Sequence, residues 1–149
     1  MPPPDDPFGL HRFVEAQSVN YADALAELRA GHKRTHWSWY VFPQLRGLGS
    51  SAMSVRYAIA SLAEAGAYLA HPVLGPRLRA CVEAMNIHAS RDAADMLGEV
   101  DARKFHSCIT LFSRVAEPGS PFHTALARFF GGAPDAATLG LLAEAGDAG

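Results

Sequence analysis

The stretch from Arg29 to Arg56 carries the side chains best suited to ligand chemistry. It contains arginines, a lysine and histidines but no acidic residue, and aromatic rings are interleaved with the cations. Arginine forms paired hydrogen bonds with phosphate, and an aromatic ring stacks on a flat base. The stretch therefore predicts a site for a small anionic ligand that carries a ring and phosphate groups. The alternative is that the rings are core residues and the charges form a solvated surface.

A second polar group is expected on a helix from Asp101 to about Val115. Lys104 and Ser107 follow Asp101 at intervals that place all three on one helix face. Trp37 or Trp39 would stack on the ligand ring, and Lys104 and Ser107 would complete the site from this helix. The alternative is that Asp101 caps the helix and Lys104 lies on the surface. The candidate ligand-binding residues are Arg34, His36, Trp37, Trp39, Gln44, Arg46, Ser51, Arg56, Tyr57, Lys104 and Ser107.

The residue types leave open whether the chain is an enzyme and which residues would be catalytic. Lys104 with Ser107 resembles a serine–lysine pair, but no nucleophile elbow accompanies it. If an N-glycosidic bond were hydrolysed, Glu64 or Asp101 would be the candidate general base, because a ribosyl cation needs an anion nearby.

No metal or other cofactor is expected. His32 and His36 are spaced for one helix face, but no third ligand is evident. Cys81 lies on an apolar helix face, and Cys108 follows His106 at an interval that does not bring helical side chains together. Both cysteines are expected to be small core residues.

The composition describes one folded domain. The chain has 149 residues, of which 49% are apolar and 19% charged, and this excludes an intrinsically disordered protein. A net charge of −2 argues against a nucleic-acid partner. No long apolar run and no secretory leader are evident, so we expect no membrane contact and a cytoplasmic location. The domain is expected at residues 6–143, between disordered tails at 1–5 and 144–149.

Helical periodicity and capping residues predict an all-α fold, a compact single domain of about eight short helices. The first helix would begin at Asp6 and end near Gln17. The next would run from Asn20, as its cap, to Gly31 at its end. Ser61 would cap a helix that runs through Leu69, and a short last helix would begin at Asp135.

The segment from Thr35 to Pro43 fits either a strand or a helix. Its tryptophans alternate as in a strand, yet its apolar residues also share a helix face. No second convincing strand exists to pair with it, and an unpaired strand would leave its backbone groups unsatisfied. We therefore expect a short helix.

A family resemblance rests on the most specific run in the chain, His36-Trp37-x-Trp39 with Phe42-Pro43-Gln44, and on shorter matches. The shorter matches include Gly47-Leu48-Gly49-x-Ser51, Tyr57, Glu64-Ala65, Lys104, Ser107 and Thr110-Leu111-Phe112. With these residues the chain resembles the bacterial domain-of-unknown-function family 1810 over residues 6 to about 142. The resemblance implies an all-helical single domain and supplies no function.

A weaker resemblance is to the helical NADAR domains, which act on ADP-ribose or ribosyl N-glycosidic derivatives. It rests on an early segment rich in glycine and aromatic residues and on Lys104-Phe105 in a late helix. This resemblance implies an ADP-ribose-like ligand and identifies no catalytic residue.

A protein–protein interaction module without catalytic activity is the alternative function. Aromatic residues beside arginine are common anchors of interfaces. The same residues would also suit single-stranded nucleic acid, but the acidic total makes this the weakest of the three hypotheses.

Overall fold

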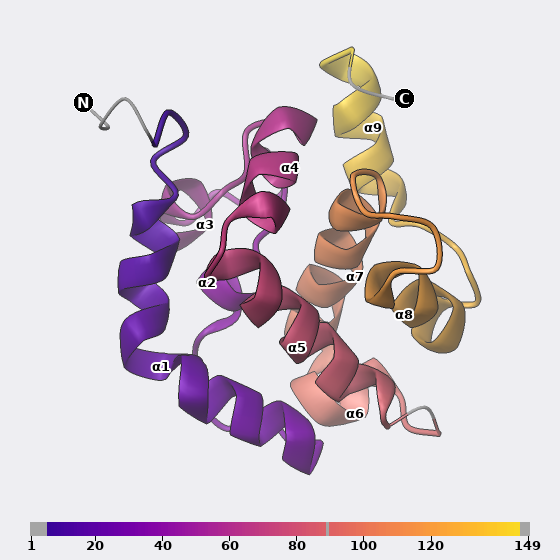
Figure 1. Ribbon diagram of the computed structural model, residues 1–149. Coiled ribbons are helices and arrows are strands. Elements are labelled where there is room, and N and C mark those ends of the chain that lie inside the picture. Colours follow the sequence, from indigo (N-terminus) through magenta and orange to yellow (C-terminus); the bar gives the residue numbers. More distant parts are fainter. Residues whose placement is uncertain (1–5, 89, 147–149) are drawn as a thin grey trace.

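The structure, a computed structural model, describes residues 6–88 and 90–146. Within these residues the chain forms nine helices and one isolated bridge between Leu45 and Ile59, which confirms the all-α prediction (Figure 1). The predicted tail at 1–5 lies outside the described residues, as do 147–149. The helices are α1 (His11–Ala30), α2 (Ser38–Val41), α3 (Ala52–Arg56), α4 (Leu62–Ala70), α5 (Leu74–Asn86), α6 (Ala93–Leu97), α7 (Glu99–Ser113), α8 (Pro121–Phe130) and α9 (Ala136–Glu144).

Helix α1 is continuous, so the prediction of two helices with a cap at Asn20 is wrong. The Asn20 side chain accepts a hydrogen bond from the Tyr40 hydroxyl at 2.9 Å instead of capping a helix. Figure 1 shows that α1 bends about halfway along. The Ser18 hydroxyl donates to Glu15 O in this region at 2.6 Å, a type of bond that bends helices.

The predicted residues, Asp6 and Gly31, cap the two ends of α1, but the helix begins later in the chain than predicted. The Asp6 carboxylate accepts from the backbone N–H groups of Leu10 at 2.8 Å and His11 at 3.1 Å, so it caps the first turn although the helix begins at His11. At the other end Gly31 has a φ of 76°, the left-handed conformation that glycine adopts at little cost.

Helix α2 confirms the helical prediction for the tryptophan segment, with Trp37 rather than Thr35 as its N-cap residue. The Trp37 ring is fully buried and meets Phe42 edge-on at 5.8 Å between ring centroids. Phe42 in turn meets Phe105 of α7 at 5.0 Å. This chain of rings fixes α2 against the core, where burial of large aromatic side chains stabilises most.

Helix α7 lies at the centre of the domain and packs against α2, α4, α6, α8 and α9. It begins at Glu99, with Gly98 as N-cap, so the prediction that Asp101 caps this helix is wrong. Gly98 has a φ of 86° and starts the helix early, which leaves Asp101 free to form ion pairs.

The two cysteines are buried and free, as expected for small core residues. Burial raises the pKa of Cys81 to about 12. Burial also raises the pKa of Cys108 well above its ordinary value. Both side chains therefore stay as neutral thiols at physiological pH.

We expect replacement of Gly75 by alanine to destabilise the fold. A Cβ at Gly75 would overlap the Leu69 carbonyl of α4, and this backbone atom cannot move aside cheaply. We expect Gly75→Ala to lower the free energy of unfolding by about 1–3 kcal/mol, measured by urea denaturation. Gly66→Ala in α4 is the matched control, because nothing lies within 4 Å of its added Cβ. That variant should be neutral or about 0.5–1 kcal/mol more stable.

Candidate functional site

The predicted site residues divide among three places in the structure. Arg34 and Trp37 lie at the first, where both bind the carboxylate of Glu27, and His36 lies in the turn between them. This carboxylate accepts from Arg34 N at 2.7 Å and from Trp37 Nε1 at 3.0 Å. It also accepts from the backbone N–H of Thr35 at 3.0 Å and from its hydroxyl at 2.7 Å.

This arrangement overturns the prediction that Trp37 stacks on a ligand, because its ring has no exposed surface. Arg34 and His36 are exposed on the outside of the same turn. Burial raises the pKa of Glu27, but the hydrogen bonds from Arg34, Thr35 and Trp37 outweigh it and bring the pKa down to about 2. The Glu27 carboxylate is therefore a structural brace that holds the entry to α2.

The second place is the Trp39–Lys104 groove, in which Lys104 covers the Trp39 ring. The groove is lined by Gln44, Leu48, Gly49, Ser54, Val100, Arg103, Lys104, Ser107, Asp135 and Ala137. The Lys104 ammonium lies over the Trp39 ring, 4.4 Å from its centroid, so the tryptophan segment and α7 do meet. The hollow beside Lys104 has a volume of about 290 Å³. Tyr57 and Trp39 line a much narrower hollow that continues from it. Tyr57 itself is buried, which restricts its contact with any ligand.

The Ser107 hydroxyl in this groove is not activated by Lys104. It lies 3.0 Å from Arg103 O and 3.3 Å from Asp135 Oδ2. The Lys104 ammonium instead pairs with Asp101 at 3.4 Å, and Asp101 also pairs with Lys33 at 2.9 Å. Burial raises the pKa of Asp101, but Lys33 and Lys104 outweigh it, so the carboxyl stays charged. A serine–lysine nucleophile has no support in this geometry.

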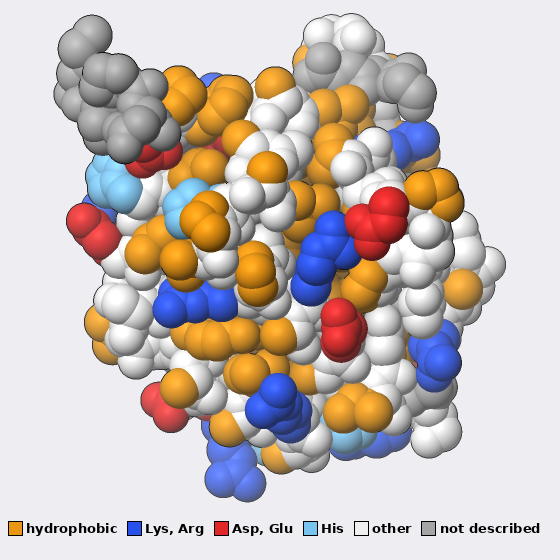
Figure 2. Space-filling view, viewed as in Figure 1, with side chains coloured by type: hydrophobic (Ala, Val, Ile, Leu, Met, Phe, Trp, Pro, Cys, Tyr) orange, Lys and Arg blue, Asp and Glu red, His pale blue; other side chains and the backbone are white. Residues whose placement is uncertain are grey.

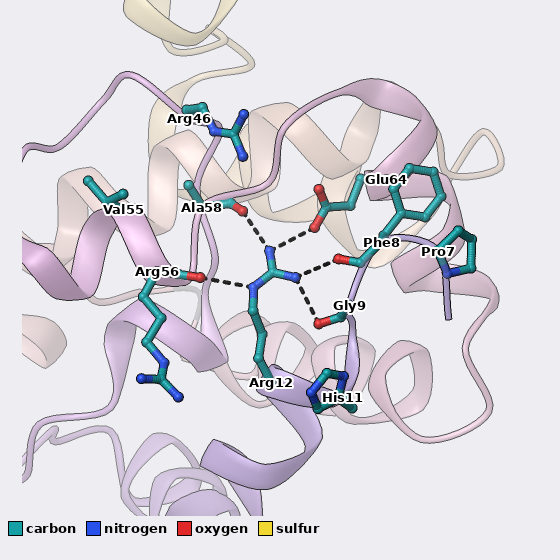
Figure 3. A pocket seen from close by; sticks show the side chains of 10 residues that line it. All are labelled: Pro7, Phe8, Gly9, His11, Arg12, Arg46, Val55, Arg56, Ala58 and Glu64. Carbon is teal, nitrogen blue, oxygen red and sulfur yellow. Dashed lines mark hydrogen bonds and ion pairs between the residues drawn. The ribbon is translucent and has the colours of Figure 1, made fainter. Parts of the chain in front are cut away.

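The third place is the Arg12 pocket, a hollow of about 630 Å³ between the N-terminal turn, α3 and α4 (Figure 3). It brings Arg46 and Arg56, which were predicted together as anion-binding residues, next to Glu64, which was predicted separately as a general base. Asp101, the other predicted general base, lies instead beside the groove. Ser51 caps α3 by accepting from Ser54 N at 3.1 Å, which accounts for it without a ligand.

Arg12 occupies the centre of the Arg12 pocket, and each of its N–H groups has an acceptor. Nε donates to Arg56 O at 2.9 Å, and Nη1 donates to Phe8 O at 2.8 Å and Gly9 O at 2.9 Å. Nη2 donates to Ala58 O at 2.8 Å and to Glu64 Oε2 at 2.9 Å. Arg12 therefore ties four parts of the chain together and is committed to structure.

The rim of the Arg12 pocket carries positive charge without acidic partners. Glu64 is only 3% exposed, and its charge is neutralised by Arg12. Arg46 and Arg56 are exposed at the rim, and among the described residues neither guanidinium has an ion-pair partner. In Figure 3 Arg46 stands beside Ala58, whereas Arg56 extends away from Arg12. Over the face in Figure 2, by contrast, lysines and arginines are scattered.

Sequence reasoning missed Phe8, His11 and Arg12 as residues of this pocket. Phe8 and Arg12 were invisible as site residues because their partners lie far away in the chain, such as Glu64 for Arg12. The one available signal was Phe8 in the turn before α1 together with His11 and Arg12 at the start of α1, a pattern that also fits an ordinary amphipathic helix start.

The comparisons with known proteins agree with this fold. The family model described as "Protein of unknown function (DUF1810)" matches residues 7–142. The chain belongs to this family. It is also similar to the crystal structure of the conserved hypothetical protein Rv1873 from Mycobacterium tuberculosis, at 50% sequence identity and a TM-score of 0.90. That match covers 93% of this DUF1810 chain and 99% of the other. No curated protein matches the chain.

The described residues of this DUF1810 protein contain neither a cluster of metal ligands nor a membrane-spanning helix. No group of three or more His, Cys, Asp or Glu side chains there could hold a metal ion. No helix in the same residues is long and apolar enough to cross a membrane.

We expect Glu27→Gln to change how stability depends on pH. The folded-state pKa of Glu27 is about 2, below its ordinary value of 4.5, so its contribution is complete above 4.5 and is lost as pH falls toward 2. Urea denaturation at pH 7 should show a loss of about 1–3 kcal/mol in the variant, and the difference should shrink at pH 3. Glu83→Gln, on an exposed position, should show no such change. An equal deficit at both pH values would contradict the assignment.

We expect Arg12→Lys to destabilise this protein strongly. Lysine cannot supply the forked donors that Arg12 directs to Phe8, Ala58 and Glu64, and the buried carboxylate would lose its partner. The free energy of unfolding should fall by about 3–5 kcal/mol in urea denaturation. Arg79→Lys is the matched control, because Arg79 binds the exposed Glu117 with both nitrogens. A similar loss in both variants would show that Arg12 has no special structural role.

Proposed function

We propose that the Arg12 pocket binds a phosphorylated metabolite with a flat ring, of the ADP-ribose or nucleotide class. The observation that carries the proposal is the pair Arg46 and Arg56 at the rim of a hollow of about 630 Å³, without acidic partners among the described residues. A hollow of this size lies within the range of about 300–1,000 Å³ typical of small-molecule sites.

The phosphate groups would bind to Arg46, and Arg56 would join it by turning its side chain toward the hollow. A guanidinium forms two parallel hydrogen bonds with a phosphate, and the attraction is strong because both partners are charged. His11 lies at the same rim and adds a ring nitrogen, although its Nδ1 already contacts Asp6 at 3.0 Å. Because Glu64 is neutralised by Arg12, the pocket keeps a net positive charge that favours an anion.

The ring of the ligand would lie against Phe8 and Val55. Phe8 is 37% exposed and Val55 is 60% exposed, and both line the pocket. Phe8 thus takes the stacking role that the sequence assigned to Trp37 and Trp39. Trp37 is buried, and Trp39 is covered on one side by Lys104.

The contacts of Glu64 favour binding over hydrolysis. Its Oε1 accepts from Ala60 N at 3.0 Å, and its Oε2 accepts from Arg12 at 2.9 Å. A general base needs a free oxygen within reach of the proton it removes. Glu64 fits better as the residue that holds Arg12 and shapes the wall of the pocket.

The alternative of an interaction module loses its main motivation. It was based on exposed aromatic anchors, but Trp37, Tyr40, Phe42 and Tyr57 are buried. Protein partners stay a possibility without a specific surface to argue for them.

Arg46→Ala should weaken binding of the phosphorylated ligand at least tenfold. A thermal-shift screen of the intact protein with ADP-ribose, NAD, AMP and inorganic phosphate would find the ligand. Saturation at about 100 times the dissociation constant adds about 2.7 kcal/mol, or roughly 5–10 °C in melting temperature. Loss of the charged hydrogen bonds of Arg46 corresponds to about 1.5–3 kcal/mol of binding free energy.

Arg34→Ala is the matched control for this experiment. Arg34 is also an exposed arginine, and its side chain lies outside the pocket lining. This variant should bind the ligand as the unmodified protein does. A screen in which none of the four compounds raises the melting temperature would refute the proposal, as would equal losses in both variants.

A further inference from the structure

The Trp39–Lys104 groove is a second hollow with its own set of lining residues. None of the residues that line it also lines the Arg12 pocket. The two hollows lie on either side of two short segments, residues 44–46 and 54–56. Gln44 and Ser54 line the groove. Arg46, Val55 and Arg56 line the Arg12 pocket. The groove therefore needs an explanation independent of the phosphorylated ligand.

Lys104 and Arg103 give the groove positive charge. Asp101 is shared by Lys33 and Lys104, so two ammonium groups compensate one carboxylate and a positive charge is left over. Lys104 is held in place by the Trp39 ring, which makes its position well defined. Arg103 lines the same groove and is exposed. A ligand carboxylate would be bound by these cations.

Asp135 lines the same groove and has one carboxylate oxygen without a partner in the described residues. Asp135 Oδ2 accepts from Thr138 N at 3.0 Å and from Thr138 Oγ1 at 2.7 Å, and it lies 3.3 Å from the Ser107 hydroxyl. Asp135 Oδ1 has no hydrogen-bond partner among the described residues. Because Asp135 already caps α9, the N-terminus of that helix is not open to an anion.

The remaining lining indicates which molecule fits beside these charges. Leu48, Val100 and Ala137 contribute apolar surface, and Val100 is 63% exposed. Gly49 brings the loop backbone close to Ser54, since a Cβ there would lie 2.5 Å from the Ser54 hydroxyl. The volume of about 290 Å³ suits a molecule much smaller than a dinucleotide.

We propose that the Trp39–Lys104 groove binds a free aliphatic α-amino acid. The carboxylate of the amino acid pairs with Lys104 and Arg103, and its ammonium group pairs with Asp135 Oδ1. Its side chain packs against Leu48 and Val100. Only a molecule with both charges satisfies the cations and Asp135 together, because covering a charged group without a partner costs binding free energy.

Isothermal titration of the intact protein with leucine tests this proposal. Two analogues, 4-methylpentanoate and 3-methylbutylamine, each lack one of the two charged groups. Leucine should bind at least tenfold more tightly than either analogue. Equal binding of leucine and 4-methylpentanoate would overturn the proposal, because Asp135 would then have no role. Absence of leucine binding would overturn it as well.

Two variants locate the site. Lys104→Gln and Asp135→Asn should each weaken leucine binding at least tenfold. Asparagine caps helices as well as aspartate does, so the Asp135 variant keeps the start of α9 and tests the charge alone. Arg34→Ala, outside the groove, should bind leucine normally. Unchanged leucine affinity in both groove variants would overturn the assignment. Titration with ADP-ribose is a separate measurement, so failure of one proposal leaves the other standing.

Discussion

The Arg12 guanidinium is the interaction on which the Arg12 pocket depends. It lies between the N-terminal turn, the end of α3, the segment before α4 and α4 itself, and it binds a carbonyl or carboxylate of each. Because backbone carbonyls supply most of its acceptors, the geometry of the walls is set by main-chain positions rather than by flexible side chains. The same contact neutralises the charge of Glu64. The free cations are thereby confined to the rim.

The elements with strong local signals were predictable from the sequence. Gly31 ends α1 through its left-handed backbone, and Ser61 and Asp135 cap α4 and α9 as expected. Asn20 and Asp101 carried equally good capping signals and were misread. Their side chains bind partners from distant segments, the Tyr40 hydroxyl and the Lys33 ammonium, and no local pattern records such contacts.

The candidate site was predictable in its residue types but not in its grouping. Trp37 and Trp39 are two residues apart, yet one is completely buried and the other lies half-buried beneath Lys104. Arg46 and Gln44 are also two residues apart, and they face different hollows. Which hollow a side chain faces depends on how the segment around the bridge between Leu45 and Ile59 packs against its neighbours. Only the folded chain determines this packing.

Chemical labelling of the two buried cysteines reports how often the helical core opens. Cys81 and Cys108 lie on α5 and α7, in the interior that the whole helical domain encloses. While the core is closed, a thiol reagent cannot reach either sulfur, and both thiols are neutral. The rate at which such a reagent labels the protein therefore measures how often the core opens far enough to admit water, separately from any motion of the surface hollows.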